Sequence, residues 1–290
     1  MTPTHVVIML AAAVTGGLMN ALAGGGTIVT FPVLIFLGQP SILANATSTV
    51  ALLPGAAASM AGYGREVRTH KEWLKTLLLP SLLGGGLGSI LLLRTPEKTF
   101  AGLAPLLVLF ATLLFMLQGI LAARRARRLP GQDAGARGTG GDDADGFSAN
   151  PAGGGALPEE DVPSLRLSSG RWVAAILFQF GVSVYGGYFG AAIGILMLSV
   201  LGFLGLTNIF AMNGLKNFFG FCINGVAAAY FILRGAVVWP VALLMMAGAI
   251  AGGYGGARLA RVIGKEKARA AVVVIGFVVT AILFWQRARS

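Results

Sequence analysis

Long apolar stretches separated by short polar connections run through most of this chain. Charged side chains stand almost entirely at the ends of these stretches, which consist of hydrophobic and small residues. The stretches cover residues 6–22, 27–38, 41–64, 73–93 and 97–121, and then 171–188, 191–205, 207–233, 237–260 and 266–286. Apolar runs of this length predict helices in a bilayer, because a helix satisfies its own backbone polar groups where no water is present.

The order and lengths of the apolar stretches predict that the second set is a copy of the first. Leu37-Gly38 corresponds to Leu204-Gly205 and Tyr63 to Tyr230, at one constant offset in the numbering. We therefore expect an all-α polytopic membrane protein with about 8–10 transmembrane or broken helices in two repeats. The first repeat is expected in residues 1–123 and the second in 171–290.

Residues 124–170 between the two sets have a different composition. They are rich in Gly, Pro, Ser and Ala and contain seven of the chain's 11 acidic residues. Such a segment cannot bury enough apolar surface to fold, so we expect a disordered linker on the cytoplasmic side.

Basic connections predict the orientation of the repeats. Residues 65–75 and 258–269 are rich in Arg and Lys and are expected in the cytoplasm. Both basic connections lie in the cytoplasm if each half crosses the membrane five times. An odd number of crossings per half would make the repeats inverted. The stretches 27–38 and 191–205 are short for a crossing, and broken or re-entrant helices remain open for both.

Composition narrows the class of protein further. Hydrophobic residues make up 56% and charged residues 11% of the chain, which excludes an ordinary soluble domain. The net charge of +11 resides in the connections, where it suits the cytoplasm and anionic lipid headgroups, so we expect a lipid bilayer as partner and no nucleic acid. The single cysteine excludes an intrachain disulfide, no metal or other cofactor is expected, and a homo-oligomer is left open.

Lys216 is the only charged residue in the middle of an apolar stretch. It lies roughly 13 Å from the start of the stretch 207–233, close to the membrane midplane. A lysine at that depth costs about 2.5–3.5 kcal/mol on insertion scales, so it is expected to face a partner, a water-filled cavity or a ligand. Because Asp and Glu are absent from the middle of every stretch, Lys216 is a candidate anion contact.

Glycine clusters interrupt corresponding places in the two halves. Gly24, Gly25 and Gly26 precede the stretch 27–38, and Gly190 precedes 191–205. Breaks of this kind are typical of transporter sites, where the next helix begins with free N–H groups and a positive dipole end. The alternative is that these glycines only allow close helix packing.

A polar stripe follows each break. Asn45, Ser48 and Thr49 share one helix face, and Asn213, Lys216 and Asn217 repeat that spacing. The two faces could line a path for a polar solute. Hydrogen bonding between helices is the alternative for the uncharged members of the stripes.

At these segments the chain resembles the TauE/SafE sulfite exporter family of bacterial inner-membrane anion permeases. The resemblance rests on Gly24-Gly25-Gly26-Thr27-Ile28 through Pro32, on Leu37-Gly38-Gln39-Pro40, and on Ala44 with Ala46-Thr47-Ser48. It covers both halves outside the linker. The second half departs from the family pattern: Gly190-Ala191-Ala192-Ile193-Gly194 replaces the glycine run, and Leu215-Lys216 replaces Thr-Ser.

The resemblance implies a secondary transporter, not an enzyme, for sulfite, sulfonates or another organic anion in the inner membrane. Its expected substrate contacts are Lys216, Asn213, Asn217, Asn45, Thr47 and Ser48, with backbone amides at Gly24, Gly25, Gly26 and Gly190. Alternating access would come from motion of one repeat against the other. The alternatives are a non-transporting scaffold or accessory subunit and, more weakly, an intramembrane hydrolase with a Ser48–Lys216 dyad.

Overall fold

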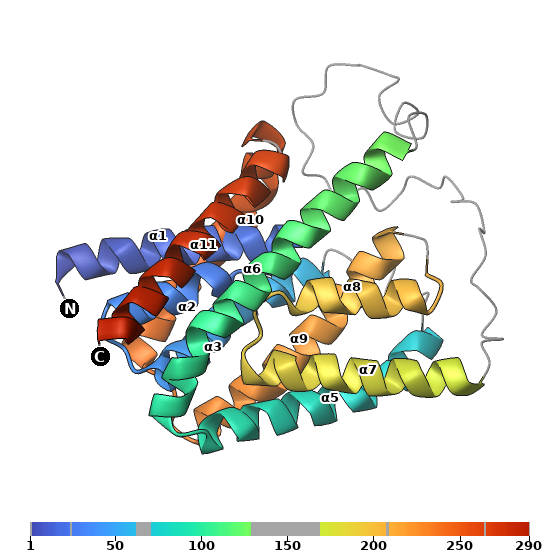
Figure 1. Cartoon of the computed structure of the whole chain (residues 1–290), viewed down its shortest axis with the longest axis horizontal. Helices are drawn as coiled ribbons and strands as arrows, with labels where there is room; N and C mark the ends of the chain where they lie inside the picture. The colour runs from blue at the N-terminus through green and yellow to red at the C-terminus, as the bar shows by residue number, and fades with distance from the viewer. Residues whose placement is uncertain are drawn as a thin grey trace.

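A computed structural model of the chain describes residues 2–23, 25–61, 71–128, 169–206, 209–263 and 265–289. All secondary structure in this part is helical (Figure 1). The first half contains α1 (Pro3–Ala23), α2 (Thr27–Phe36), α3 (Ser41–Ala61), α5 (Lys71–Arg94) and α6 (Glu97–Arg128). The second contains α7 (Ser169–Tyr188), α8 (Ile193–Phe203), α9 (Ile209–Leu233), α10 (Trp239–Ile263) and α11 (Lys265–Arg289). The expected all-α fold class is therefore confirmed.

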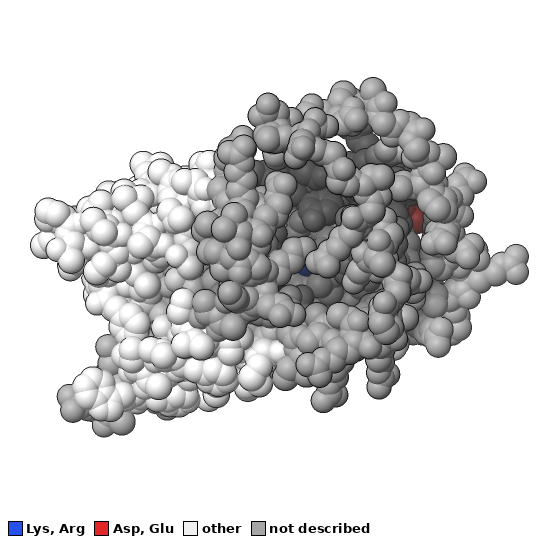
Figure 2. Space-filling model, turned by 90° about the horizontal axis from the view of Figure 1, so that it is seen from above, with Lys and Arg blue, Asp and Glu red and all other residues white. Residues whose placement is uncertain are grey.

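Surface composition agrees with a membrane location. Among the residues that the structure describes, four helical segments are long and apolar enough to cross a bilayer: Pro3–Asn20, Glu72–Arg94, Glu97–Leu117 and Ala211–Leu233. On α5, Leu79, Leu83, Leu87 and Leu91 recur every fourth residue and are all exposed, which is the stripe that a lipid-facing helix presents. In Figure 2 the described surface shows almost no Lys, Arg, Asp or Glu.

Helices α2 and α8 are the short members of the fold. They have 10 and 11 residues, so each extends about 15 Å, half of a hydrocarbon core about 30 Å thick. Neither crosses a bilayer by itself. The five full crossings per half, and with them the inverted orientation of the repeats, stay a prediction.

The two short helices end in the same way. After α2, the N–H of Gln39 donates to the Leu34 carbonyl at 3.0 Å, and Gly38 is left-handed with φ 84°. After α8, the N–H of Leu206 donates to the Leu201 carbonyl at 3.1 Å, and Gly205 has φ 88°. These are matching Schellman caps, in which glycine takes a backbone conformation that costs other residues energy.

The most extensive helix–helix contacts each pair a helix of the first half with a helix of the second half. Helix α1 packs on α10 and α7 packs on α5, and the second pair runs side by side in Figure 1. Helix α3 also contacts α10 while α9 contacts α5. Each half therefore supplies the main packing partner of the other half, as related repeats that interlock would do.

Glycines let these exchanged pairs approach closely. A Cβ atom at Gly252 would lie 2.0 Å from the carbonyl oxygen of Val14, and one at Gly88 would lie 2.1 Å from that of Val184. Both glycines therefore serve close helix packing, since backbone atoms occupy the space a side chain would need.

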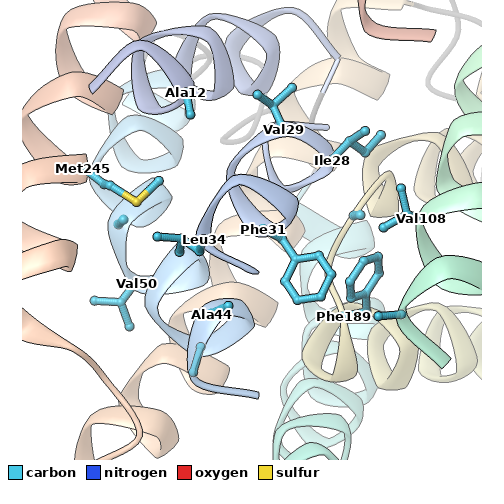
Figure 3. Close-up of a cluster of buried hydrophobic side chains, with 14 of the residues drawn as sticks. Ala12, Ile28, Val29, Phe31, Leu34, Ala44, Val50, Val108, Phe189 and Met245 are labelled. Atoms are coloured by element: carbon cyan, nitrogen blue, oxygen red, sulfur yellow. The ribbon is translucent and has the colours of Figure 1, made fainter. Parts of the chain in front are cut away.

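Helix α2 is buried on nearly every side. Ile28, Phe31 and Leu34 are fully buried, and Phe31 makes an edge-to-face contact with Phe189 at a centroid distance of 5.2 Å. Figure 3 shows these two rings facing one another across the core. Phe189 directly follows α7, so this contact joins the start of the α7–α8 connection to α2.

The predicted linker begins later than expected. Helix α6 continues through Arg128 and α7 already begins at Ser169, so residues 124–128 and 169–170 are helical. Residues 129–168 lie outside the described residues, as does Tyr63. The disordered cytoplasmic linker stays a prediction for that interval.

Candidate functional site

A pocket lies between α3 and α9, where α2 and α8 begin. It is open on one side, and its empty space of about 610 Å³ includes solvent at the opening. The first half contributes Asn20, Thr27, Thr49, Leu52, Leu53 and Ala56. The second half contributes Gly190, Ile193, Gly194, Lys216, Asn217, Gly220, Phe221 and Asn224. The pocket therefore needs both halves to exist.

Lys216 is the charged residue of the pocket. It is 5% exposed, and it forms no hydrogen bond or ion pair with the residues that the structure describes. A buried ammonium without a partner is costly, and a long flexible side chain at a protein–water boundary would normally reach out to solvent. The structure instead keeps Lys216 at a pocket, as a ligand-binding role would require.

Neutral polar side chains accompany Lys216. Asn217 is adjacent to it and Asn224 lies two turns further along α9. Neither amide has a hydrogen-bond partner in the described part of the chain, so both are available to a solute. From the first half, Asn20, Thr27 and Thr49 complete this polar part of the lining.

The start of α8 adds free backbone donors. Gly190 and Ala192 take left-handed conformations with φ 80° and 61°, which turn the chain sharply between α7 and α8. The N–H groups of Ile193 and Gly194 then have no acceptor among the described residues. Because the unpaired donors of a helix N-terminus carry partial positive charge, this end of α8 favours an anion in the pocket that it lines.

Ala192 carries the strain of that turn. A left-handed conformation costs a residue with a Cβ about 1–2 kcal/mol. Strained backbone persists where surrounding structure holds it, and such positions gather at functional sites. The Tyr185 hydroxyl donates to the carbonyl of neighbouring Ala191 at 2.9 Å, which helps to hold the turn.

Equivalent positions of α3 and α9 face the pocket. Thr49, Leu53 and Ala56 of α3 and Asn217, Phe221 and Asn224 of α9 line the pocket at the same spacing, four and then three residues apart. Ser48 precedes Thr49 as Lys216 precedes Asn217. The two helices thus present matching faces, and the charge occurs in the second half alone.

Three predicted contacts of the first half lie elsewhere and form cross-links. The Asn45 amide donates to the Tyr188 carbonyl at 3.1 Å. Thr47 accepts from the N–H of Val238 at 3.1 Å, immediately before α10, and the Ser48 hydroxyl pairs with that of Thr30 at 2.5 Å. These side chains join α3 to its neighbours, and they do not line the pocket.

The glycines predicted as backbone contacts also fall into two groups, one that lines the pocket and one that does not. Gly190 lines the pocket, whereas Gly25 and Gly26 do not. A Cβ at Gly26 would lie 2.4 Å from the Gly16 carbonyl oxygen, and one at Gly25 would lie 2.5 Å from the Phe115 ring. Close packing explains both. Gly24 lies outside the described residues.

Of the predicted second-half contacts, Lys216 and Asn217 line the pocket and Asn213 does not. Asn20, Thr27 and Asn224 also line the pocket but were not among the predicted substrate contacts. Asn20 and Thr27 flank the triple glycine on either side, a signal that could have selected them. Within the described residues no group of His, Cys, Asp or Glu could hold a metal ion.

A helical membrane fold with a polar pocket where two short helices begin is typical of a polytopic membrane transporter. The match to the family model for "Sulfite exporter TauE/SafE" extends over residues 8–283, nearly the whole chain. The chain therefore belongs to the TauE/SafE family, as the resemblance in its motifs predicted.

Curated relatives agree with this class. A "Probable membrane transporter protein" of Haemophilus influenzae is 26% identical over 267 residues, which cover 91% of this chain and 88% of the relative. The "Probable membrane transporter protein YfcA" of Escherichia coli K12 is 22% identical over 292 residues, covering 98% and 91%. No solved structure gives a significant match.

Proposed function

We propose that this transporter carries a small anion, and that the anion binds beside Lys216 in the pocket between α3 and α9. The observation that carries the proposal is the position of Lys216, which is 5% exposed, lines the pocket and has no partner in the described part of the chain. An anion would supply the missing counter-charge. The free N–H groups at the start of α8 and the amides of Asn217 and Asn224 would bind its oxygens.

Sulfite, a sulfonate or another organic anion fits this chemistry. Each has several oxygen acceptors for the donors around Lys216, and the pocket also has apolar lining from Leu52, Leu53 and Phe221 for a short carbon chain. The name of the family supports sulfite as the first substrate to test.

Alternating access between the halves is the proposed mechanism. The pocket is built from equivalent positions of α3 and α9, so motion of one half against the other would open it on alternate sides. A negative cell interior drives a monoanion outward by about 2.3 kcal/mol per 100 mV, so export needs no coupling ion. We place this activity in the bacterial inner membrane, with the basic connections in the cytoplasm.

A non-transporting scaffold explains the site less well. A scaffold would not require a lysine held without a partner at a pocket, which only a ligand makes favourable. The hydrolase reading required a Ser48–Lys216 dyad, but the Ser48 hydroxyl pairs with Thr30 and does not line the pocket that holds Lys216.

The test is sulfite flux in proteoliposomes at a clamped membrane potential, with Lys216→Gln beside wild type. We expect a loss of about tenfold or more, because a charge-assisted hydrogen bond contributes about 1.5–3 kcal/mol. Lys75→Gln is the matched control, since the Lys75 side chain is 73% exposed and its partner Glu72 lies on the same helix. Equal flux in a folded Lys216→Gln protein would refute the proposed site.

A further inference from the structure

We propose that the pocket discriminates by charge and accepts monoanions in preference to dianions of the same size and shape. This inference rests on the proposed function and specifies the substrate class of the same site. It follows from the number of positive charges that the pocket supplies, which is independent of whether the natural substrate is a sulfur compound.

One full positive charge is available. Lys216 is the single ionisable side chain of the described lining, and its five polar companions are neutral amides and hydroxyls (Asn20, Thr27, Thr49, Asn217 and Asn224). The sequence places no other charged residue in the middle of an apolar stretch. Within the described part of the chain, no second cationic side chain lines the pocket.

The start of α8 adds only part of a charge. A helix N-terminus is equivalent to about half of a positive charge, and its effect falls off within the first turn. Lys216 and the N–H groups of Ile193 and Gly194 together therefore compensate one negative charge well and a second one poorly. A second charge would lose its hydration without an equal partner, which is costly in a buried site.

Part of the pocket lining is apolar. Leu52, Leu53 and Phe221 provide that part of the lining, together with Ile193 and Ala56. Such a surface tolerates the methyl group of a small organic acid but hydrates no charge. Size and shape alone would not separate a sulfonate from a phosphonate here, so charge becomes the basis of discrimination.

Methanesulfonate and methylphosphonate form the matched probe pair. Both are tetrahedral, with three oxygens and one methyl group, but methylphosphonate carries a second negative charge above its second pKa. Binding of each to the purified full-length protein is measured by calorimetry, once above and once below that pKa. Methanesulfonate stays a monoanion throughout, so it corrects for any change in the protein itself.

Above the second pKa of the phosphonate, we expect methylphosphonate to bind at least about tenfold more weakly than methanesulfonate, a difference of about 1.4 kcal/mol. Below that pKa, the two affinities should converge. Equal binding of both ligands above the pKa, or tighter binding of the dianion, would overturn charge discrimination and leave anion binding intact. Binding of neither ligand at either pH would overturn this inference, and unchanged sulfite flux in Lys216→Gln would separately overturn the proposed function.

The substitution Asn224→Lys should raise the preference of the pocket for a dianion. Asn224 lines the pocket, with its Oδ1 atom 3.5 Å from the position of a Cβ on Gly190, so a lysine there adds a second cation close to the turn before α8. The ratio of methylphosphonate to methanesulfonate affinity above the second pKa should rise about tenfold or more. Asn224→Gln adds length without charge and should leave the ratio unchanged. A folded Asn224→Lys protein with the wild-type ratio would contradict the inference. The comparison of the two ligands in the wild-type protein does not depend on whether any variant folds.

Discussion

At the scale of single residues, the polar side chains of α3 separate into two roles. Asn45, Ser48 and Thr49 share one face of the helix by spacing, yet only Thr49 lines the pocket. The Ser48 hydroxyl is fully buried against that of Thr30, which is on α2. Ser48 thus stabilises the position of α2, while Lys216 of α9 lines the pocket.

Ser48→Ala should lower the stability of the protein and spare transport. It leaves the buried Thr30 hydroxyl without its side-chain partner, although Thr30 keeps the Gly26 carbonyl at 3.2 Å, so we expect a loss of about 1 kcal/mol. Thermal unfolding in detergent and anion flux in liposomes measure the two effects. Loss of flux at unchanged stability would show that Ser48 contacts the anion after all.

Lys216→Gln should show the opposite combination. Removing a lysine from the middle of a membrane segment relieves an insertion cost of about 2.5–3.5 kcal/mol, so stability should stay equal or rise while flux falls. The same unfolding assay checks this. A variant that loses stability and flux together would indicate that Lys216 has a structural partner instead of a ligand.

At the scale of helices, the exchanged pairs α1–α10 and α5–α7 depend on close backbone approach. Gly252 meets the backbone of Val14 in one pair and Gly88 meets that of Val184 in the other. Backbone atoms cannot yield as the end of a side chain can, so any added Cβ must separate the helices. Dispersion and weak polar contacts between these surfaces would then be lost along several turns.

Gly88→Ala and Gly252→Ala should each destabilise the protein by about 1–3 kcal/mol, the usual cost of overpacking. Gly181→Ala on α7 is the matched control, because nothing lies within 4 Å of a Cβ at that position, and alanine is the better helix former. Unfolding midpoints of the three purified variants compare them directly. A neutral Gly252→Ala variant would contradict the proposed tight packing of α1 on α10.

At the scale of the whole molecule, the two halves stabilise each other through the helices that pack between them. Helix α1 packs on α10, α7 packs on α5, and the pocket takes its lining from both halves. We therefore expect the halves to stay in contact without the covalent connection between α6 and α7. The interlocked arrangement also means that neither half presents a complete site on its own.

A chain cut between α6 and α7 should remain a functional unit. A protease site introduced within 129–168 and cleaved after membrane insertion should leave two fragments that purify together and retain most of the flux. The uncleaved protein with the same insertion is the control. Separation of the fragments in mild detergent would contradict the exchange of packing partners between the halves.

The amino-acid sequence by itself determined the helices and the two short segments after glycine breaks, and it singled out Lys216 as a candidate contact. These features are local: hydropathy marks each helix, glycine marks each interruption, and a single charge in an apolar stretch stands out without any knowledge of its neighbours. The family motifs of the first half, including Gly38 at its left-handed position, also follow from short segments. Only the tertiary structure decided which polar residues line the pocket. That depends on how each helix is rotated and on what the other half places against it, as with Asn45 bound to the Tyr188 carbonyl and Asn20 facing the pocket.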